Sequence, residues 1–359
     1  MSSTESPDTA TAAALPVPPA GPGARGAAGE TVRWVTLPGL TLNVRTPAGP
    51  PEADAAERAK AAARDREPAL YVHGLGGSSL NWSALMPLLA DRVAGEAVDL
   101  PGFGDSPPPD DGNYSIPAQA RTVIRYLDAA GRGPVHLVGN SLGGAVVTRV
   151  AAARPDLVRT LTLISPALPE IPPQLTALPT AMLGIPGVAG LFRRLTREWT
   201  PEQRTRGVLT LCYGDPARIT PEGFNAAVDE YVRRLELPYF WEVMERTARG
   251  LVNAYTLGGQ HGLWRQAERV LAPTLLVYGG RDRLVSYRMA RRAAAAFRGS
   301  RLVTLPEAGH VAMMEYPETV ARSFRELLDS GTTVTDATPG AGTGSAGAAP
   351  AGPPVADRS

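Results

Sequence analysis

The chain has 359 residues, of which 43% are hydrophobic and 20% charged, and its formal net charge is +1. These values fit a globular protein with a substantial core, either one large α/β domain with an insertion or two domains. The balanced charge gives no reason to expect nucleic acid or an anionic membrane surface as a partner, and no run of about 20 apolar residues predicts a membrane-spanning helix.

Residue types that bind metals or form disulfides are scarce. Cys212 is the only cysteine, which excludes an internal disulfide and suits a reducing compartment. No basic region followed by an apolar run begins the sequence, so we expect no secretory signal and a cytoplasmic location. The histidines lack the spacing of metal ligands, so we expect no metal and no other cofactor. They are His73, His136, His261 and His310.

Both ends of the chain are rich in Ala, Pro, Ser, Thr and Gly. Such segments bury too little apolar surface to offset the entropy lost by an ordered chain. We therefore expect residues 1–29 and 331–359 to be disordered tails, with an ordered region between them.

Between these tails, predicted strands alternate with predicted helices. Two strands, at 31–37 and 40–46, flank a Pro-Gly pair that is typical of a hairpin. Residues 47–68 predict a surface loop with at most a short solvated helix. The next elements are a strand at 69–73, a helix at 80–92, a strand at 94–100, a helix at 116–130, a strand at 135–138, a helix at 145–154 and a strand at 161–164. This alternation predicts a mostly parallel sheet with helices on both faces.

The alternation stops at residues 168–260, which contain helical patterns broken by prolines. We interpret this segment as an inserted helical cap, in which most apolar side chains belong to a core and a minority face a pocket. Strands at 274–278 and 302–305 and helices at 287–297 and 317–328 then restore the pattern. The predicted α/β core therefore comprises residues 30–167 and 261–330.

A catalytic motif lies at the end of the strand at 135–138. The apolar strand runs into a Gly-x-Ser-x-Gly pentapeptide centred on Ser141, and a helical pattern follows, which is the context that makes this motif informative. The tight turn requires small residues two positions before and after the serine, and these are Gly139 and Gly143. Asn140 and Leu142 complete the pentapeptide. We therefore predict that Ser141 is a nucleophile.

A serine hydroxyl needs a base that removes its proton, and histidine suits this role near neutral pH. His310 is the best candidate, because it follows a strand and lies in a loop after Gly309. His136 lies within an apolar strand and is expected to be packed and hydrogen-bonded. His261 lies in a polar hinge and is expected to be exposed.

The base in turn needs an acid that fixes its tautomer, and Asp282 is the candidate. It follows a strand through Gly279 and Gly280 and lies one helix and one strand before His310. A helix cap is the alternative role for this aspartate.

The tetrahedral intermediate needs backbone N–H donors aimed at its oxyanion. Leu142, directly after the nucleophile, is expected to supply one donor. Leu75, after His73 and Gly74, is expected to supply the other, and Gly76 lets this loop approach closely.

These motifs together resemble the α/β-hydrolase superfamily over residues 31–329. The motifs are His73-Gly74 after a strand, Asp99-x-x-Gly102-x-Gly104-x-Ser106, the Ser141 pentapeptide, Asp282 after a strand, and Gly309-His310. The chain order Ser…Asp…His is that of the superfamily. The resemblance implies that His73, Asp99 and Asp105 shape loops and do not react. Some members carry the acid one strand earlier, where this chain has only Ser165-Pro166.

Several branches of the superfamily can be compared with this chain. Haloalkane dehalogenases and epoxide hydrolases use aspartate as nucleophile, and Ser141 argues against both branches. The meta-cleavage carbon–carbon bond hydrolases share Gly-Asn-Ser-x-Gly-Gly with residues 139–144, but usually have Trp where this chain has Val311 and Pro in the loop that contains Leu75. We therefore expect a carboxylic ester hydrolase acting on a small substrate with an apolar acyl group. Meta-cleavage hydrolases, perhydrolases and, less favoured, a non-catalytic binder of hydrophobic ligands are the alternatives.

Overall fold

The computed structural model describes residues 30–47 and 66–332. The predictions for the tails, and for most of the loop at 47–68, concern residues outside these ranges. The last helix begins at Pro317 and ends at Thr332.

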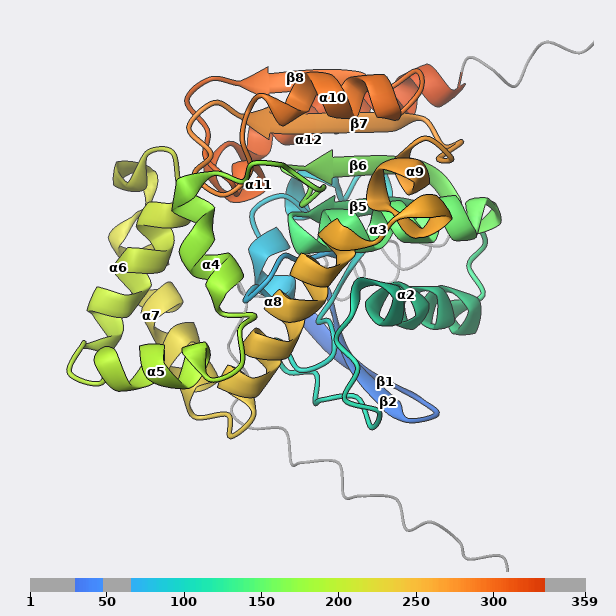
Figure 1. Ribbon diagram of the computed structural model, residues 1–359. Helices are drawn as coiled ribbons and strands as arrows, with labels where there is room; N and C mark the ends of the chain where they lie inside the picture. The colour runs from blue at the N-terminus through green and yellow to red at the C-terminus, as the bar shows by residue number, and fades with distance from the viewer. Residues whose placement is uncertain (1–29, 48–65, 333–359) are drawn as a thin grey trace, which may run out of the picture.

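The described part of the chain is built around an eight-stranded sheet (Figure 1). Its spatial order is β1-β2-β4-β3-β5-β6-β7-β8. Strands β3 to β8 are mutually parallel, whereas β1 pairs with β2, and β2 with β4, in antiparallel fashion. The strands are β1 (Thr31–Leu37), β2 (Leu40–Thr46), β3 (Glu67–Val72), β4 (Val93–Val98), β5 (Val135–Asn140), β6 (Val158–Ile164), β7 (Thr274–Gly279) and β8 (Arg301–Leu305). The predicted mostly parallel sheet is confirmed.

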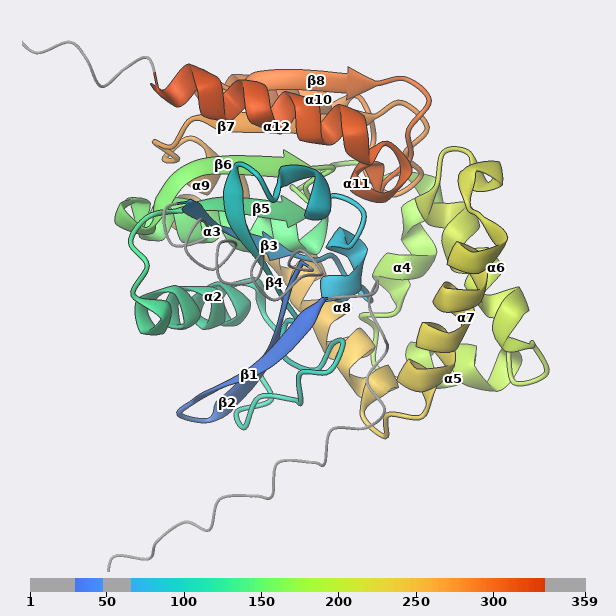
Figure 2. The ribbon, with the colours of Figure 1, turned by 180° about the vertical axis from the view of Figure 1, so that it is seen from behind.

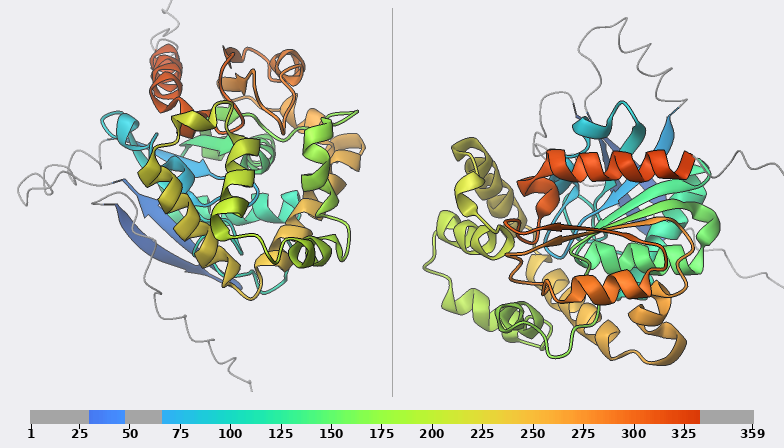
Figure 3. Two further views of the ribbon diagram at one scale, coloured as in Figure 1. Left: turned by 90° about the vertical axis from the view of Figure 1, so that its left-hand side faces the viewer. Right: turned by 90° about the horizontal axis from the view of Figure 1, so that it is seen from above.

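Helices cover both faces of this sheet (Figures 2 and 3). One face carries α2 (Ile116–Ala130), α3 (Leu142–Ala153), α9 (Leu263–Ala267) and α10 (Met289–Ala296). The other carries α11 (Ala312–Glu315), α12 (Pro317–Thr332) and the 3₁₀ turns η1 (Ser79–Trp82) and η2 (Pro87–Leu89). Two separate apolar layers result, because the central parallel strands bury side chains on both of their faces.

The segment after β3 differs from the prediction. A single helix at 80–92 is wrong, since only η1 and η2 form there, joined by turns. Pro87 explains the difference, because it lacks an N–H for an α-helical hydrogen bond and its ring clashes with the preceding turn. The apolar side chains are buried all the same, and the ring of Trp82 lies 5.3 Å from that of Tyr71.

The chain between β6 and β7 contributes a group of helices that we call the insert, residues 168–260. Helices α4 to α7 lie beyond the carboxyl ends of the parallel strands, and α8 packs on α2, α4 and α5 (Figures 1 and 3). The elements are η4 (Leu175–Ala177), α4 (Leu178–Met182), α5 (Val188–Leu195), α6 (Pro201–Cys212), η5 (Pro216–Arg218), α7 (Pro221–Leu235), α8 (Phe240–Thr256) and η6 (Gly259–His261).

The expectation that most apolar side chains of the insert form a core is wrong. Ile171 and Leu175 are each 81% exposed. The other exposed large apolar side chains of this segment are Leu178, Met182, Ile185, Leu191, Phe192, Leu195, Trp199, Val208, Val252 and Leu257. The described helices of the insert form one layer, and no further layer of the described chain covers their outer face. Hydrophobic spacing alone did not reveal this, because it does not tell a covered face from an uncovered one.

The strand order reverses direction at β3, because β4 lies on one side of it and β5 on the other. Loops that leave such neighbouring strands diverge, and they open a crevice at the carboxyl edge of the sheet. The segments after β3 and after β5 contain the motifs singled out in the sequence.

Gly139, near the end of β5, can be used to test how closely α3 packs on β5. A Cβ at Gly139 would lie 2.6 Å from Val147 Cγ2 and 2.7 Å from the Gly143 carbonyl oxygen. We expect Gly139→Ala to lower the free energy of unfolding by about 2–4 kcal/mol, measured by urea denaturation. Gly190→Ala in α5 is the control: nothing lies within 4 Å of its added Cβ, so it should stabilise by about 0.5–1 kcal/mol. Equal effects of the two changes would contradict the packing argument.

Candidate active site

Ser141 occupies the turn between β5 and α3 with a strained backbone. Its φ of 53° and ψ of −118° are unfavourable for a residue with a side chain. Hydrogen bonds hold the turn in place: Ser141 N donates to Ile164 O at 3.1 Å, and Ala167 N donates to Ser141 O at 2.9 Å. As a residue, Ser141 is partly exposed although its backbone is tightly held.

Close backbone approach makes the neighbouring glycines necessary. A Cβ at Gly143 would lie 2.8 Å from the Val72 carbonyl carbon, so β3 passes directly beside the start of α3. A Cβ at Gly74 would lie 3.1 Å from Ser141 Cβ. The loop after β3 therefore lies against the predicted nucleophile, as its expected role in binding the oxyanion requires.

Asp282 and His310 are hydrogen-bonded, with 2.9 Å between Oδ2 and Nδ1. Both are buried, with exposed fractions of 7% and 4%. The other carboxylate oxygen, Oδ1, accepts from Leu284 N at 2.8 Å and Val285 N at 2.9 Å, so Asp282 also caps its own turn. Burial works to raise the pKa of Asp282, but His310 and the two backbone donors outweigh it and hold this pKa below its ordinary value.

Asn140 links the serine turn to the histidine loop. Its Nδ2 donates to Ile164 O and to His310 O, both at 3.0 Å. Among residues 66–332, Ser141 Oγ makes no hydrogen bond to His310. In enzymes without bound substrate such bonds are often long or poorly aligned and tighten when substrate binds.

The loop that begins at His73 fixes the direction of the Leu75 N–H. His73 Nε2 accepts from Leu100 N at 3.0 Å, so its proton is on Nδ1, which donates to Gly74 O at 2.8 Å. Gly77 N donates to the same oxygen at 3.0 Å. Because the peptide is planar and trans, a fixed Gly74 carbonyl fixes the opposed Leu75 N–H. In the described part of the chain this N–H has no acceptor, and neither has that of Leu142.

Asp99 organises the loop that follows β4. One carboxylate oxygen accepts from Ser79 N at 2.5 Å and the other from Asp105 N at 2.9 Å. Ser106 Oγ donates to Asp99 O at 2.7 Å and accepts from Asn43 N at 2.8 Å. Complete burial raises the pKa of Asp99, although the hydrogen bonds oppose this effect. These contacts are those of a residue that shapes loops.

The remaining histidines behave as expected from the sequence. His136 is buried in β5, with Nδ1 2.9 Å from Thr160 Oγ1 and Nε2 2.8 Å from Glu67 Oε2. His261 is exposed in η6. Both predictions are confirmed, and His310 is the histidine that lies beside Asn140 and Asp282.

Glu315 is a buried carboxylate next to this histidine that the sequence did not predict. Glu315 accepts from Gly309 N at 2.7 Å, from Gly214 N at 3.2 Å and from Asp215 N at 2.9 Å. His310 N donates to Cys212 O at 2.7 Å. The end of α6 is therefore tied to the histidine loop through Glu315, whose burial no sequence spacing had revealed.

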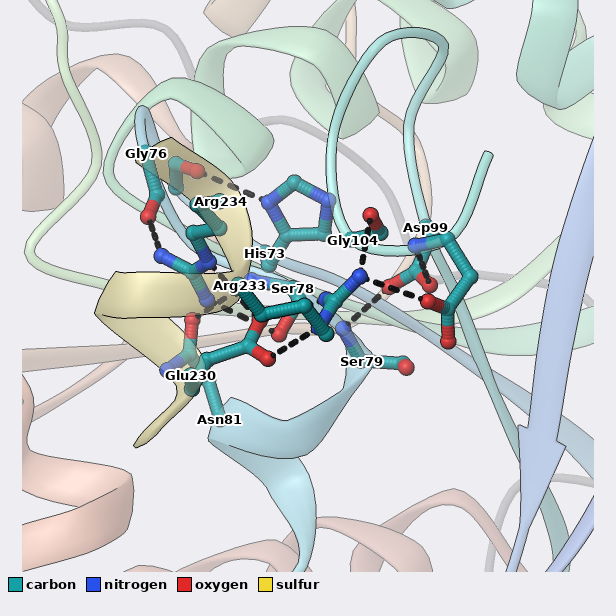
Figure 4. Close-up of polar contacts among 12 residues, drawn as sticks. His73, Gly76, Ser78, Ser79, Asn81, Asp99, Gly104, Glu230, Arg233 and Arg234 are labelled. Carbon is teal, nitrogen blue, oxygen red and sulfur yellow. Dashed lines mark hydrogen bonds and ion pairs between the residues drawn. The ribbon is translucent and has the colours of Figure 1, made fainter. Parts of the chain in front are cut away.

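A charged cluster on α7 was also missed (Figure 4). Glu230, Arg233 and Arg234 share one side of the helix and face the loops after β3 and β4. Their spacing of three and four residues is the detectable signal, since such pairs lie on one helix face. That signal does not reveal that the face is turned inward.

No group of three or more His, Cys, Asp or Glu side chains suited to a metal ion occurs among the described residues. The described helices also include none with the length and apolar character needed to cross a membrane.

Comparison of the sequence with known families gives a match to the alpha/beta hydrolase family over residues 69–323. The dihydrolipoyllysine-residue acetyltransferase component of the acetoin cleaving system of Cupriavidus necator is 28% identical over 73% of this chain, which spans only 62% of that relative. The pimeloyl-[acyl-carrier protein] methyl ester esterase of Neisseria meningitidis serogroup B is 29% identical, covering 72% of this chain and 92% of the esterase.

Solved structures share the architecture. The meta-cleavage product hydrolase of Pseudomonas fluorescens IP01 superposes with a TM-score of 0.64 over 83% of this chain and 97% of that one, at 19% identity. At this identity the likeness concerns the fold alone, so it does not favour carbon–carbon bond chemistry.

His73 makes stability depend on pH. Burial, assisted by the charge of Arg234 and opposed by the bond to Gly74, lowers the pKa of His73 to about 4. An unfolded histidine titrates near 6.5, so the unfolded state takes up a proton first and the free energy of unfolding falls as pH decreases from about 6.5 to 4. The expected contribution is about 3 kcal/mol.

Denaturant titrations across this pH range should reveal this loss. His73→Gln keeps a donor and an acceptor but does not titrate. In this variant the free energy of unfolding should therefore depend less on pH between about 6.5 and 4. His261→Gln, at an exposed position, serves as the substitution control. An unchanged pH slope in His73→Gln would show that His73 does not take up the proton.

Proposed function

The chain belongs to the alpha/beta hydrolase family, and we propose that it hydrolyses carboxylic esters through Ser141, with His310 as base and Asp282 as the orienting acid. The hydrogen bond between Asp282 and His310, 2.9 Å long and buried at the edge where Ser141 lies, carries this proposal. The named esterase among the relatives supports the choice of ester substrates.

Acylation follows from this arrangement. Asp282 Oδ2 accepts the proton on His310 Nδ1, which leaves Nε2 free to take the Ser141 hydroxyl proton as Oγ attacks the ester carbonyl. The N–H groups of Leu75 and Leu142 stabilise the negative oxygen of the tetrahedral intermediate. Collapse of the intermediate breaks the bond to the alcohol oxygen, which takes the proton from His310 Nε2, and an acyl ester remains on Ser141.

Deacylation repeats the same steps with water. His310 removes a proton from water as it attacks the acyl carbon, and the second tetrahedral intermediate uses the same two N–H donors. Its collapse returns the proton to Ser141 Oγ and releases the carboxylic acid. The pKa of Asp282, held below its ordinary value, keeps this carboxylate charged while His310 carries its extra proton.

The insert is proposed to act as a cap that encloses the acyl group, over a core formed by residues 30–167 and 261–330. Met244 of α8 supports this role, because its Sδ and Cε lie 3.5 Å from the position of a Cβ on Gly76, in the proposed oxyanion loop. An apolar side chain at this place bounds the space next to the reacting carbonyl.

The central experiment compares wild type with Ser141→Ala. Wild type should hydrolyse p-nitrophenyl esters and react once with a fluorophosphonate probe. The variant, which keeps the fold because serine and alanine differ by one oxygen, should lose labelling and at least about 10³-fold in kcat. A meta-cleavage dienone assayed in parallel tests the carbon–carbon alternative. Labelling or ester turnover that survives in Ser141→Ala would exclude this nucleophile.

Met244 should set acyl chain length. Replacing it with Ala opens space and should move the preferred p-nitrophenyl ester to longer chains, while Met244→Trp should move it to shorter ones. The ratio of kcat/KM values between two chain lengths is the measurement, with an expected change of about 10-fold or more. Met182→Ala, at an exposed position of the same insert, should leave the ratio unchanged. Equal ratios in all four proteins would contradict the proposed role of α8.

A further inference from the structure

We propose that Arg234 of helix α7 is a positioning residue for the oxyanion loop, so that docking of the insert fixes the part of this loop that follows Leu75. The inference rests on the proposed function, because it assigns a catalytic use to the Leu75 N–H. It concerns a side chain from the insert that does not itself contact the reacting atoms.

The guanidinium of Arg234 contacts the oxyanion loop at two points (Figure 4). Its Nη1 donates to the Gly76 carbonyl oxygen, and its Nη2 donates to Ser78 Oγ at 3.1 Å. The remaining edge is held by Glu230, since Nε donates to Glu230 Oε1 at 2.7 Å. The planar guanidinium thus connects the Glu230 carboxylate of the insert to the Gly76 carbonyl and the Ser78 hydroxyl of the loop.

The loop needs such support because its own sequence is permissive. Gly76 has a φ of +68°, and two adjacent glycines allow many backbone conformations in the absence of outside contacts. Bonds inside the loop fix the Gly74 carbonyl, which lies before Leu75. The contact with Arg234 fixes the Gly76 carbonyl, which lies after it, so both sides of Leu75 are anchored.

Arg233 extends the same attachment to the neighbouring loop. Its Nη1 donates to Asp105 Oδ1 at 2.8 Å and to Gly104 O at 3.4 Å, while Nε donates to Glu230 Oε2 at 2.8 Å. Asp105 belongs to the loop organised by Asp99. One turn of α7 therefore holds the loops after β3 and β4 together.

Burial makes these contacts stronger than ordinary surface ion pairs. The side chains of Glu230, Arg234 and Arg233 are 10%, 15% and 23% exposed. Arg233 pairs with the carboxylates of Glu230 and Asp105, and Arg234 pairs with Glu230. Burial works to raise the pKa of Glu230, yet the two arginines outweigh it and lower this pKa. Charge-assisted hydrogen bonds with little water nearby are among the stronger polar contacts in proteins.

Movement of the insert would break this attachment at a cost. The arginines could recover their bonds from water, but the Gly76 carbonyl and Ser78 hydroxyl would lose the partners that define the loop. Docking of the insert thus contributes to the order of the loop that carries the Leu75 N–H.

The test compares Arg234→Ala with Arg249→Ala. Arg249 also lies in the insert, but it donates to Gly184 O at 2.9 Å and pairs with Glu245, both within the insert. We expect Arg234→Ala to lower kcat about 10- to 100-fold, less than loss of an oxyanion donor, with KM changed less than about threefold. The pH profile of kcat should keep its shape, because Asp282 and His310 are untouched. Arg249→Ala should have wild-type kcat.

Two further measurements separate positioning from loss of fold. Arg234→Lys, which restores one charged donor, and free guanidinium added to Arg234→Ala should each recover part of kcat. In a double-mutant cycle, Ser78→Ala should cost less in the Arg234→Ala background than in wild type. Additive losses, or no rescue in a variant that remains folded, would overturn the proposal.

Amide hydrogen exchange of Gly77 and Ser78, whose N–H groups donate to Gly74 O and to Asn81 Oδ1, gives a readout that does not depend on hydrolysis. Exchange should accelerate about 10-fold or more in Arg234→Ala and stay at the wild-type rate in Arg249→Ala. Equal exchange in the two variants would overturn the positioning role. If Ser141→Ala kept full esterase activity, the proposed function would fail, and the exchange measurement would still decide whether Arg234 holds the loop.

Discussion

The close contact between β3 and the start of α3 is the constraint on which the rest of the site depends. It requires glycine at position 143, and the packing of α3 back on β5 requires glycine at position 139. Between these two close approaches, Ser141 has a backbone conformation that residues with side chains avoid. The strain persists because hydrogen bonds from β6 and from the segment after it hold both sides of the turn. The same contact sets the loop after β3 beside Ser141, so the turn and the loop are defined together.

Buried carboxylates connect this fixed centre to the more variable parts of the chain. Asp282 joins its own turn to His310, Glu315 joins the histidine loop to the end of α6, and Glu230 joins two arginines that hold the loops after β3 and β4. Each carboxylate accepts several hydrogen bonds, which offsets the cost of removing its charge from water. The histidine loop and the loop after β3 are therefore each attached to the insert at a separate point.

The sequence predicted the sheet well, because its strands depend on local signals. Apolar runs gave the strands, the hairpin at Pro38-Gly39 has the predicted boundaries, and helix α2 begins and ends where its apolar spacing indicated. The motif order led to Asp282 and His310, which the structure brings within hydrogen-bonding distance. The prediction of one helix at 80–92 after β3 was wrong, because Pro87 does not fit inside an α-helix.

The insert was predicted least well, and the reason is physical. Hydrophobic spacing predicts the buried face of a helix only where the helix packs on the core through apolar side chains. In α7 the attachment to the core includes Glu230, Arg233 and Arg234, whereas the exposed positions of α4 and α5 carry large apolar residues. The polarity pattern in this part of the insert is thus partly inverted relative to an ordinary surface helix. A helical layer set over a strand edge rich in backbone carbonyls and carboxylates meets polar partners there, and arginine is the side chain best suited to bind them.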